Sequence, residues 1–487
     1  MRRLLLFAYH FPPDASIGSL RWARMIPLLR ERGWTTDVVA ATVAGPGASG
    51  PHEPGESRGG CDAARVLRVP QPVLAAERAE RAAWSFYDGL RRRRRSRFRK
   101  GKARAASPSP AEPQGAADAH ADAAPARAAG WPRGDLAWRL SSVRGWARVF
   151  WTWLERERYR AWAREAVRAL RQSGDAVRYD AVVATSPPHW VQDIVRAYAG
   201  RRRTPFVMDL RDPWATTEAL LEPVASPLWL RLAEKEEARC ARDAVVVAAN
   251  NRNAAEAFVA MHPAASGKVA VVRNGWDEKN VRPGAMRDVG RTRDPHRFTV
   301  VYTGTLYFDR SPRRLFTAAA RAIHDVGATP ATFCLEIMGR IENGTPDEIR
   351  RMAEEEGVGP HLVLHPPGSR DDARRLMGRA AVLVSLPWSH SLAIPAKIYE
   401  YMTFPAWLLV LAAADAAPAR MLSQSEAHVV DPDDVGTMAR VLRDCYDAYM
   451  GGARAGPIAT GMRFSRAEAV AALVDALERA LPGKMEA

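Results

Sequence analysis

The chain has 487 residues, of which 47% are hydrophobic and 26% are charged, so its composition is globular and its length suits two or three cores. Its four cysteines lie far apart without a C-x-x-C spacing, and its apolar runs fall short of the ~20 residues that a membrane span needs. The sequence therefore predicts no disulfide framework, no zinc site and no membrane-spanning helix. We expect a cytoplasmic protein, at most peripheral at the inner face of the cytoplasmic membrane.

The net charge of +16 is largely local. The stretch from Arg91 to Arg104 holds ten basic residues and no acid, and residues 100–130 are rich in Ala, Pro, Ser and Gly. This composition cannot bury enough surface to offset chain entropy, which predicts a disordered insertion at about 91–130. Such a segment is either a solvated loop without a specific partner or a contact for an anionic membrane surface.

In the first half of the chain, short apolar runs alternate with amphipathic stretches. Residues 4–8 are too short a run for a signal peptide and are predicted to form the first buried strand. Further strands are expected at 36–41, 181–185, 206–210, 244–248 and 268–272, and helices at 20–32, 159–172, 190–199 and 229–241. This alternation indicates a parallel, doubly wound sheet.

The pattern begins again after a charged, turn-rich stretch at 282–297. Strands are expected at 298–302, 333–338, 362–365, 382–386 and 408–412, and helices at 312–325, 346–356, 371–378, 395–402 and 435–449. This pattern predicts a second α/β sheet. Parallel sheets of this kind bind ligands at the carboxyl ends of their strands. We therefore place domains at 1–285 and 286–460, with a last helix in 461–487 that returns to the first domain.

Two motifs match common patterns without their structural context. Residues 45–50 read G-x-G-x-x-G, but a loop and not a helix follows them, so we reject a dinucleotide site. Asp431-Pro-Asp433 matches a metal-binding D-x-D, yet it precedes the helix expected at 435–449, where carboxylates cap helices. We expect no metal ligands.

Polar residues follow the predicted strands of the first half. Gly18 lets backbone approach a ligand at the start of a helix, with His10 and Arg21 beside it. His189 follows the strand at 181–185. After the strand at 206–210, Asp209, Arg211 and Asp212 supply acid, base and hydrogen-bonding groups for an acceptor hydroxyl, or form a structural ion pair.

The second half carries candidate anion-binding residues. Gly304 and Thr305 open a loop with Arg310 close behind, and a glycine beside an arginine suits a diphosphate. Ile394, Pro395 and Ala396 begin a helix whose Lys397 and Glu400 lie on one face. The alternative is a lysine–glutamate pair on a solvated helix face.

These segments, together with N-G-x-D at 274–277, resemble glycosyltransferase family four of the GT-B fold, polysaccharide-assembly type. The resemblance covers both halves of the chain outside the insertion. It implies an acceptor-binding first domain and a nucleotide-sugar-binding second domain, with two Rossmann-like sheets facing one cleft. It further implies that Glu400 binds the ribose, that Lys397 meets the diphosphate and that backbone at Gly339, Arg340 and Gly368 contacts the base. Many members carry a second Glu where this chain has Leu392.

The expected function is glycosyl transfer from a nucleotide sugar to a lipid-linked or saccharide acceptor in surface polysaccharide biosynthesis. Retention of configuration is implied by the family. The nucleotide sugar is a substrate, so no cofactor is expected. The expected acceptor contacts are His10, Arg21, His189 and Asp209, and the expected catalytic groups are Asp209, Arg211, Asp212, Arg310 and Lys397.

Three other functions fit parts of the sequence. A GT-B sugar-nucleotide epimerase would share the donor site without an acceptor groove. A nucleic-acid-binding protein would use the basic run, although we expect no specific nucleic acid. A non-catalytic scaffold would fit the replacement of the family's glutamate by Leu392.

Overall fold

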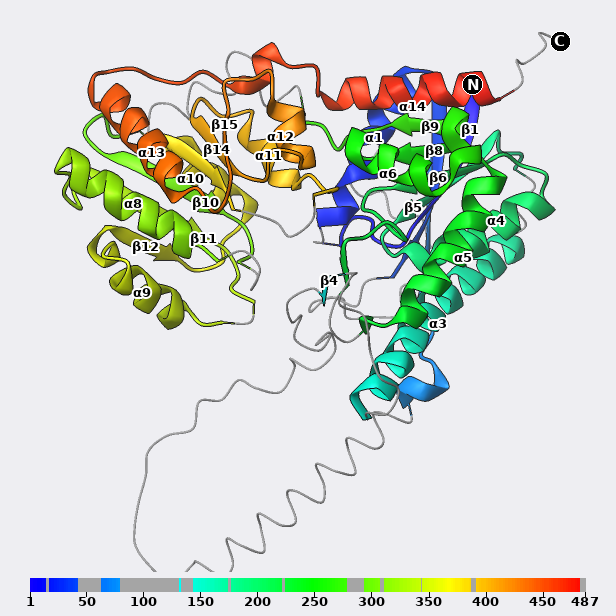
Figure 1. Ribbon diagram of the computed structural model, residues 1–487. Coiled ribbons are helices and arrows are strands. Elements are labelled where there is room, and N and C mark those ends of the chain that lie inside the picture. The colour runs from blue at the N-terminus through cyan, green and yellow to red at the C-terminus, as the bar shows by residue number, and fades with distance from the viewer. Residues whose placement is uncertain are drawn as a thin grey trace, which may run out of the picture.

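The computed structural model describes residues 1–14, 17–42, 63–78, 131–132, 143–173, 177–220, 224–277, 293–306, 311–342, 344–386 and 391–481. These residues form two α/β lobes, each with helices on both faces of one sheet (Figure 1). The predicted insertion at about 91–130, the domain boundary near 285, the G-x-G-x-x-G at 45–50 and Arg310 lie outside the described residues.

The first lobe contains a seven-stranded parallel sheet in the order β3-β2-β1-β5-β6-β8-β9. The strand order reverses between β1 and β5, which is the switch point where such sheets bind ligands. The central strands are mostly apolar because helices cover both faces of the sheet, and their buried polar residues lie toward their carboxyl ends. The strands are β1 (Arg2–Ala8), β2 (Trp34–Ala41), β3 (Arg65–Val69), β5 (Ala181–Ser186), β6 (Phe206–Leu210), β8 (Ala244–Ala249) and β9 (Val269–Val271).

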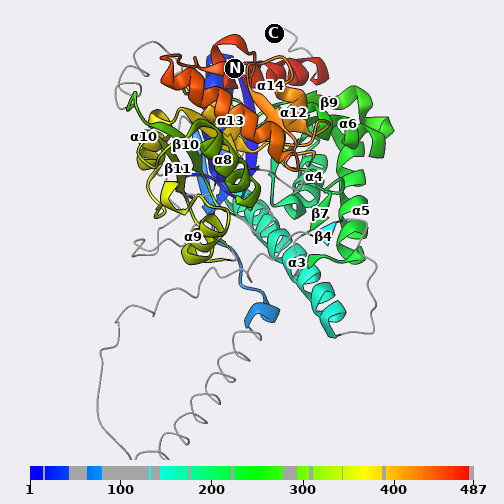
Figure 2. The ribbon, with the colours of Figure 1, turned by 60° about the vertical axis from the view of Figure 1, so that its left-hand side comes forward.

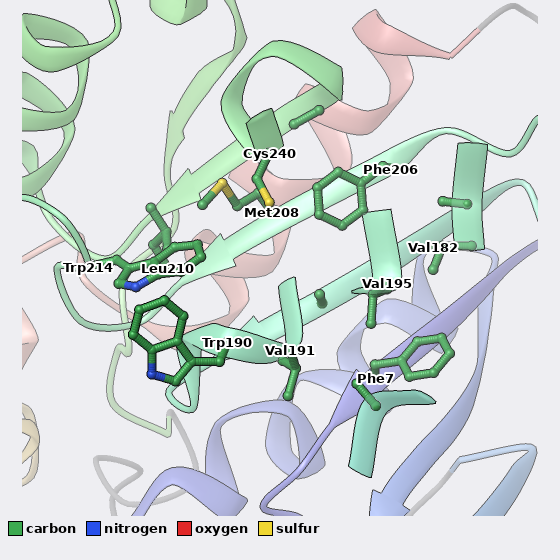
Figure 3. Packing of buried hydrophobic residues seen from close by; sticks show 14 of the residues in the cluster. Phe7, Val182, Trp190, Val191, Val195, Phe206, Met208, Leu210, Trp214 and Cys240 are labelled. Carbon is green, nitrogen blue, oxygen red and sulfur yellow. The ribbon is translucent and has the colours of Figure 1, made fainter. Parts of the chain in front are cut away.

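The helices of the first lobe pack in two layers. One layer contains α1 (Leu20–Glu31) and α14 (Arg466–Ala480), and the other contains α3 (Val143–Gln172), α4 (Gln192–Arg201) and α5 (Pro227–Asp243). In the second layer, Trp190 and Trp214 meet edge to face with ring centroids 5.6 Å apart, beside Met208 of β6 (Figure 3). A short helix, α6 (Arg252–Met261), follows β8.

The second lobe contains a six-stranded parallel sheet in the order β12-β11-β10-β13-β14-β15, with its reversal between β10 and β13. Its strands are β10 (Phe298–Thr303), β11 (Phe333–Met338), β12 (Leu362–His365), β13 (Val382–Ser385), β14 (Trp407–Leu411) and β15 (His428–Val430). Its helices are α8 (Arg313–Val326), α9 (Pro346–Glu355) and α13 (Val435–Met450) on one face, and α10 (Arg370–Arg379), α11 (Ala396–Tyr401) and α12 (Ala417–Leu422) on the other.

Two neighbouring segments connect the lobes. Trp276 pairs with Ser465 in a parallel bridge, and the Arg466 amide donates to the Trp276 carbonyl at 2.8 Å. Gly275 has φ +64° and its Cα lies against the Arg466 backbone, where a side chain would collide. Beyond this crossing, α14 runs along the first lobe (Figure 1) and packs beside α1 on one face of the sheet, where it contacts β8 and β9.

The observed elements follow the predicted alternation, and the GT-B architecture is present. The main difference is α3, which begins at Val143 and not near 159. Its first turns place Trp146 and Phe150 outward, so they lack the polar outer face by which we predict helices. The strands β3 and β15 and the helices α6 and α12 were not predicted. Among the described residues, no helix is both long and apolar enough to cross a bilayer.

Candidate active site

A buried carboxylate organises the carboxyl edge of the first sheet. Asp209, at the end of β6, is 1% exposed and accepts hydrogen bonds from Arg21 at 3.0 Å, the Trp22 indole at 2.7 Å and the Thr185 hydroxyl at 2.7 Å. These donors, from α1 and β5, join three elements at the switch point. The contacts fit a residue that positions its neighbours more than one that meets an acceptor hydroxyl.

Arg21, like Asp209, is buried and hydrogen-bonded to protein groups. Its guanidinium is buried and donates to the Val272 carbonyl and to the Asn274 side chain, both at 2.8 Å, besides Asp209. It therefore ties the start of α1 to the crossing segment between the lobes. In this conformation the predicted acceptor contact is an internal tie, because its partners are all protein groups.

Arg211, Asp212 and His189 lie closer to the surface at this edge. The Arg211 guanidinium lies over Gly18, so a side chain at Gly18 would displace it, and its Nε is 3.6 Å from the half-exposed Asp212 carboxylate. His189 stacks on Trp214 with ring centroids 5.5 Å apart. Burial, together with the positive charge of Arg211, lowers the pKa of His189 to about 3, so its imidazole is neutral at physiological pH.

His10 lies at the end of β1, where its Nδ1 is 2.5 Å from Asp14. Its side chain is partly exposed, as is expected of a group that faces a ligand. The structure thus gathers His10, Gly18, His189, Arg211 and Asp212 on loops that follow β1, β5 and β6, the three neighbouring strands of the switch point.

At the carboxyl edge of the second sheet, two backbones meet closely. Gly339, after β11, has φ +155°, and a Cβ there would collide with the Gly304 carbonyl. The Gly304 amide donates to the Met338 carbonyl at 2.8 Å, and the Tyr302 hydroxyl donates to the carbonyl of Thr305. Only a residue without a side chain fits at Gly339, which leaves backbone groups accessible at this edge. Arg340 and Gly368 are exposed nearby on the following loops.

The predicted donor helix is α11, which follows β13 and a turn. The helix begins at Ala396, one residue later than predicted, with Pro395 as its N-cap and Ile394 buried beneath it. Lys397 donates to Glu400 at 3.0 Å, with side chains 32% and 24% exposed, so both remain available to a ligand. Ala396, just before Lys397, is exposed.

Charged groups of both lobes face each other beside Glu400. Arg24 of α1 pairs with Asp277 at 2.8 Å. Partial burial and then the positive charge of Arg24 lower the pKa of Arg370, which begins α10, while Glu400 and Asp277 act in the opposite direction. The positive charges of Arg24 and Arg370, from different lobes, therefore repel each other, and an anionic ligand between them would offset this repulsion.

One carboxylate in the interlobe contact was not predicted. Glu218 of the first lobe, just before β7 (Ala219–Leu220), accepts hydrogen bonds from the Ser391 amide and hydroxyl and, at 3.4 Å, from the Leu392 amide. Asn251 donates to the Leu392 carbonyl at 2.7 Å. Two side chains of the first lobe, Glu218 and Asn251, thus bond to the backbone of Leu392. Leu392 is the position where many members of the family that the sequence resembles carry a second glutamate. No local pattern marks Glu218, because its partner is 173 residues away in sequence.

The described residues contain no cluster of three or more His, Cys, Asp or Glu placed to bind a metal. In the D-x-D segment, Asp431 accepts a hydrogen bond from the Asp433 amide at 2.8 Å. The N-cap of α13 is the next residue, Asp434, which accepts from the Thr437 amide at 2.9 Å. The segment therefore serves a turn and a cap, with the capping residue one position later than predicted.

Sequence comparison finds relatives among glycosyltransferases. The chain matches no protein-family model. Over 326 residues it is 27% identical to D-inositol 3-phosphate glycosyltransferase 1 of Catenulispora acidiphila, an alignment that covers 64% of this chain and 75% of that protein. Over 198 residues it is 29% identical to D-inositol 3-phosphate glycosyltransferase of a Mycobacterium species, covering 40% of this chain but only 43% of that protein.

Structure comparison shows the fold. HepE of Anabaena, solved in complex with UDP, superposes with a TM-score of 0.56 at 14% identity, covering 98% of this chain and 100% of that chain. Two Rossmann-like lobes, each with its switch point toward the other, match this neighbour. The chain has the GT-B fold, and its sequence relatives are glycosyltransferases.

Proposed function

We propose that this protein transfers a glycosyl unit from a nucleotide-sugar donor to a saccharide or lipid-linked acceptor in surface polysaccharide biosynthesis. The observation that carries the proposal is the carboxyl edge of the second sheet. There, Lys397 and Glu400 stand partly exposed on α11, and the Gly304–Gly339 contact opens the backbone. The likeness to glycosyltransferases and to a fold solved with UDP supports it. Both sequence relatives are transferases, which favours transfer over epimerisation.

In this proposal the second lobe binds the donor. Glu400 accepts hydrogen bonds from the ribose hydroxyls, so the Lys397–Glu400 pair opens when the nucleotide arrives. Lys397 then turns to the diphosphate together with Arg310 and the backbone of Gly304 and Thr305. The exposed backbone at Gly339, Arg340 and Gly368 meets the base.

The first lobe supplies the acceptor side. Arg211 and Asp212 are the polar groups that reach the cleft, with His10 and the neutral His189 as hydrogen-bond partners. Asp209 and Arg21 are reassigned as positioning residues, because burial and internal hydrogen bonds occupy them. An acceptor with a phosphate group, such as the inositol phosphate in the relatives' names, belongs in any acceptor screen beside saccharide and lipid-linked acceptors.

Transfer breaks the bond between the anomeric carbon and the donor phosphate and forms a bond to the acceptor oxygen, whose proton is lost. Lys397 and Arg310 stabilise the charge that develops on the departing nucleoside diphosphate, and the anomeric configuration is retained. Because cationic side chains fill this role, activity should survive chelation by EDTA. Turnover that is lost with EDTA and restored by magnesium or manganese would contradict the metal-independent part of the proposal.

A thermal-shift screen over UDP-, GDP- and ADP-sugars tests the donor assignment. A ligand at about 100 times its Kd stabilises the native state by about 2.7 kcal/mol, a measurable rise in Tm. We expect one nucleotide class to raise Tm in the full chain. A screen in which no nucleotide sugar raises Tm would argue for the non-catalytic alternative.

The basic stretch from Arg91 to Arg104 belongs to the membrane part of the proposal. Cationic segments bind anionic leaflets with a strong dependence on ionic strength. Deleting this stretch should reduce salt-reversible binding to anionic vesicles while leaving turnover of a soluble acceptor unchanged. Equal vesicle binding by the intact chain and the deletion variant would show that this stretch does not bind the membrane.

A further inference from the structure

The outer end of α3 displays an aromatic face. Trp146, Phe150 and Trp153 are 60%, 41% and 44% exposed, and their spacing of four and three residues places them on one side of the helix. The Phe150 and Trp153 rings lie 6.1 Å apart, so the side chains touch one another. Four other large hydrophobic residues of the described chain are at least 36% exposed, and none of them is on α3.

The helix that carries this face is anchored on its opposite side. Thr152 is buried and lies 2.9 Å from the Ser226 hydroxyl, and Leu154 is buried beside it. Further along α3, Trp162 and Ala166 enter the core under the first sheet. The aromatic face is therefore a rigid surface of the folded lobe, and Figures 1 and 2 both show this end of α3 reaching beyond the body of the lobe.

Charged residues follow the aromatic face along α3. The next position on the same side is Glu157, which pairs with Arg156 and Arg164. Over its whole length α3 contains eight arginines against three glutamates, and two of these arginines, Arg156 and Arg160, pair with acids of α4 and α5. Exposed tryptophans at one end of a basic helix match the surface of a bilayer, where indole rings enter the interfacial region and arginines meet lipid phosphates.

We propose that the Trp146–Phe150–Trp153 face of α3 inserts into the interface of an anionic membrane. Charge decides between the candidate occupants of this face. A second copy of the chain would set this arginine-rich helix against another of its kind, and the like charges would repel. An anionic leaflet complements both the apolar face and its basic surroundings. The proposal does not rest on the transfer reaction.

The test uses the full chain and two triple variants. One carries Trp146→Gln, Phe150→Gln and Trp153→Gln; the matched control carries Val73→Gln, Val363→Gln and Met450→Gln, which remove three other exposed hydrophobic side chains. Co-sedimentation with vesicles of equimolar phosphatidylglycerol and phosphatidylcholine is measured at low salt and at about 1 M NaCl, where the Debye length is about 3 Å. High salt removes the contribution of basic segments and leaves that of inserted rings.

We expect the aromatic variant to lose roughly tenfold or more of its partitioning at high salt, and the control to bind as the wild-type chain does. Equal binding by the aromatic variant and the wild-type chain would overturn the proposal. Light scattering without vesicles tests the alternative occupant. If the wild-type chain and the control variant are dimers and the aromatic variant is a monomer, the face contacts a second copy and the proposal is overturned. If the triple variant does not fold, Trp146→Gln alone, at the most exposed position, must still weaken binding.

Discussion

The carboxyl edges of the two sheets use polar residues differently. In the first lobe, Asp209 and Arg21 are buried and bonded to protein groups, with only loop residues such as Arg211 and Asp212 reaching outward. In the second lobe, Lys397 and Glu400 stay partly exposed and pair only with each other among the hydrogen bonds of the described residues. The same topology thus buries its polar groups at one edge and leaves them partly exposed at the other.

This difference separates residues that look alike in sequence. An acid at a strand end and an acid on a following helix are both reasonable catalytic candidates until their partners are known. Asp209 has three donors in place before any ligand arrives, whereas Glu400 has one partner that a ligand can replace. We therefore expect substitutions at the first edge to change stability and those at the second edge to change binding.

The largest expected effect follows Asp209→Ala. Removing this carboxylate leaves the buried Arg21 without its counter-charge, which should lower the free energy of unfolding by about 3–5 kcal/mol in urea denaturation. The control Asp212→Ala removes a half-exposed acid at the same edge and should change stability by less than about 0.5 kcal/mol. If Asp209→Ala is as stable as wild type but lacks turnover, Asp209 takes part in the chemistry and the contrast between the edges fails.

A smaller effect is expected from the contact between the lobes. Glu218→Gln weakens three hydrogen bonds to Ser391 and Leu392, each worth about 1 kcal/mol, so the KM for the donor should rise several-fold with little change in kcat. The matched control is Glu256→Gln, which loses only an exposed pair with Arg420. A change in kcat alone would place Glu218 in the acceptor step and not in the donor loop.

The last expected effect concerns pH and appears only below pH ~6.5. The pKa of His189 is about 3 in the folded chain against ~6.5 when unfolded, so the unfolded state binds the proton first as pH falls. The neutral imidazole therefore contributes stability above pH ~6.5 that is lost between pH ~6.5 and ~3. His189→Gln should flatten the decline of unfolding free energy by up to about 1.4 kcal/mol per pH unit in this window. A variant with the wild-type slope would show that His189 is not held neutral.

The sequence predicts the architecture well because parallel strands buried on both faces are apolar runs that stand out against the helices between them. It also predicts which loops reach the switch points, since those loops follow the strand ends. It does not predict the partners. Asp209 and Glu218 are both acids beside a strand, and only the fold brings Arg21 to one and Ser391 to the other across 188 and 173 positions.

The aromatic end of α3 shows a second limit. Periodicity identifies helices that bury one face and solvate the other, but the first turns of α3 are aromatic on the outside and anchored by Thr152 and Leu154 on the inside. Periodicity therefore predicts no helix for such a segment, although the segment is rich in aromatic residues. Exposure of its tryptophans becomes meaningful only once the fold shows which side is covered.

The donor assignment is tested most directly by calorimetric titration of a nucleoside diphosphate, chosen from the thermal-shift screen, into the wild-type chain and the Glu400→Ala variant. Loss of the hydrogen bonds to the ribose should weaken binding by roughly tenfold or more. The Tm of the free variant should stay near that of wild type, because Glu400 is partly exposed and, among the described residues, its side chain bonds to Lys397 alone. Unchanged affinity in the folded variant would contradict the placement of the donor at the carboxyl edge of the second sheet.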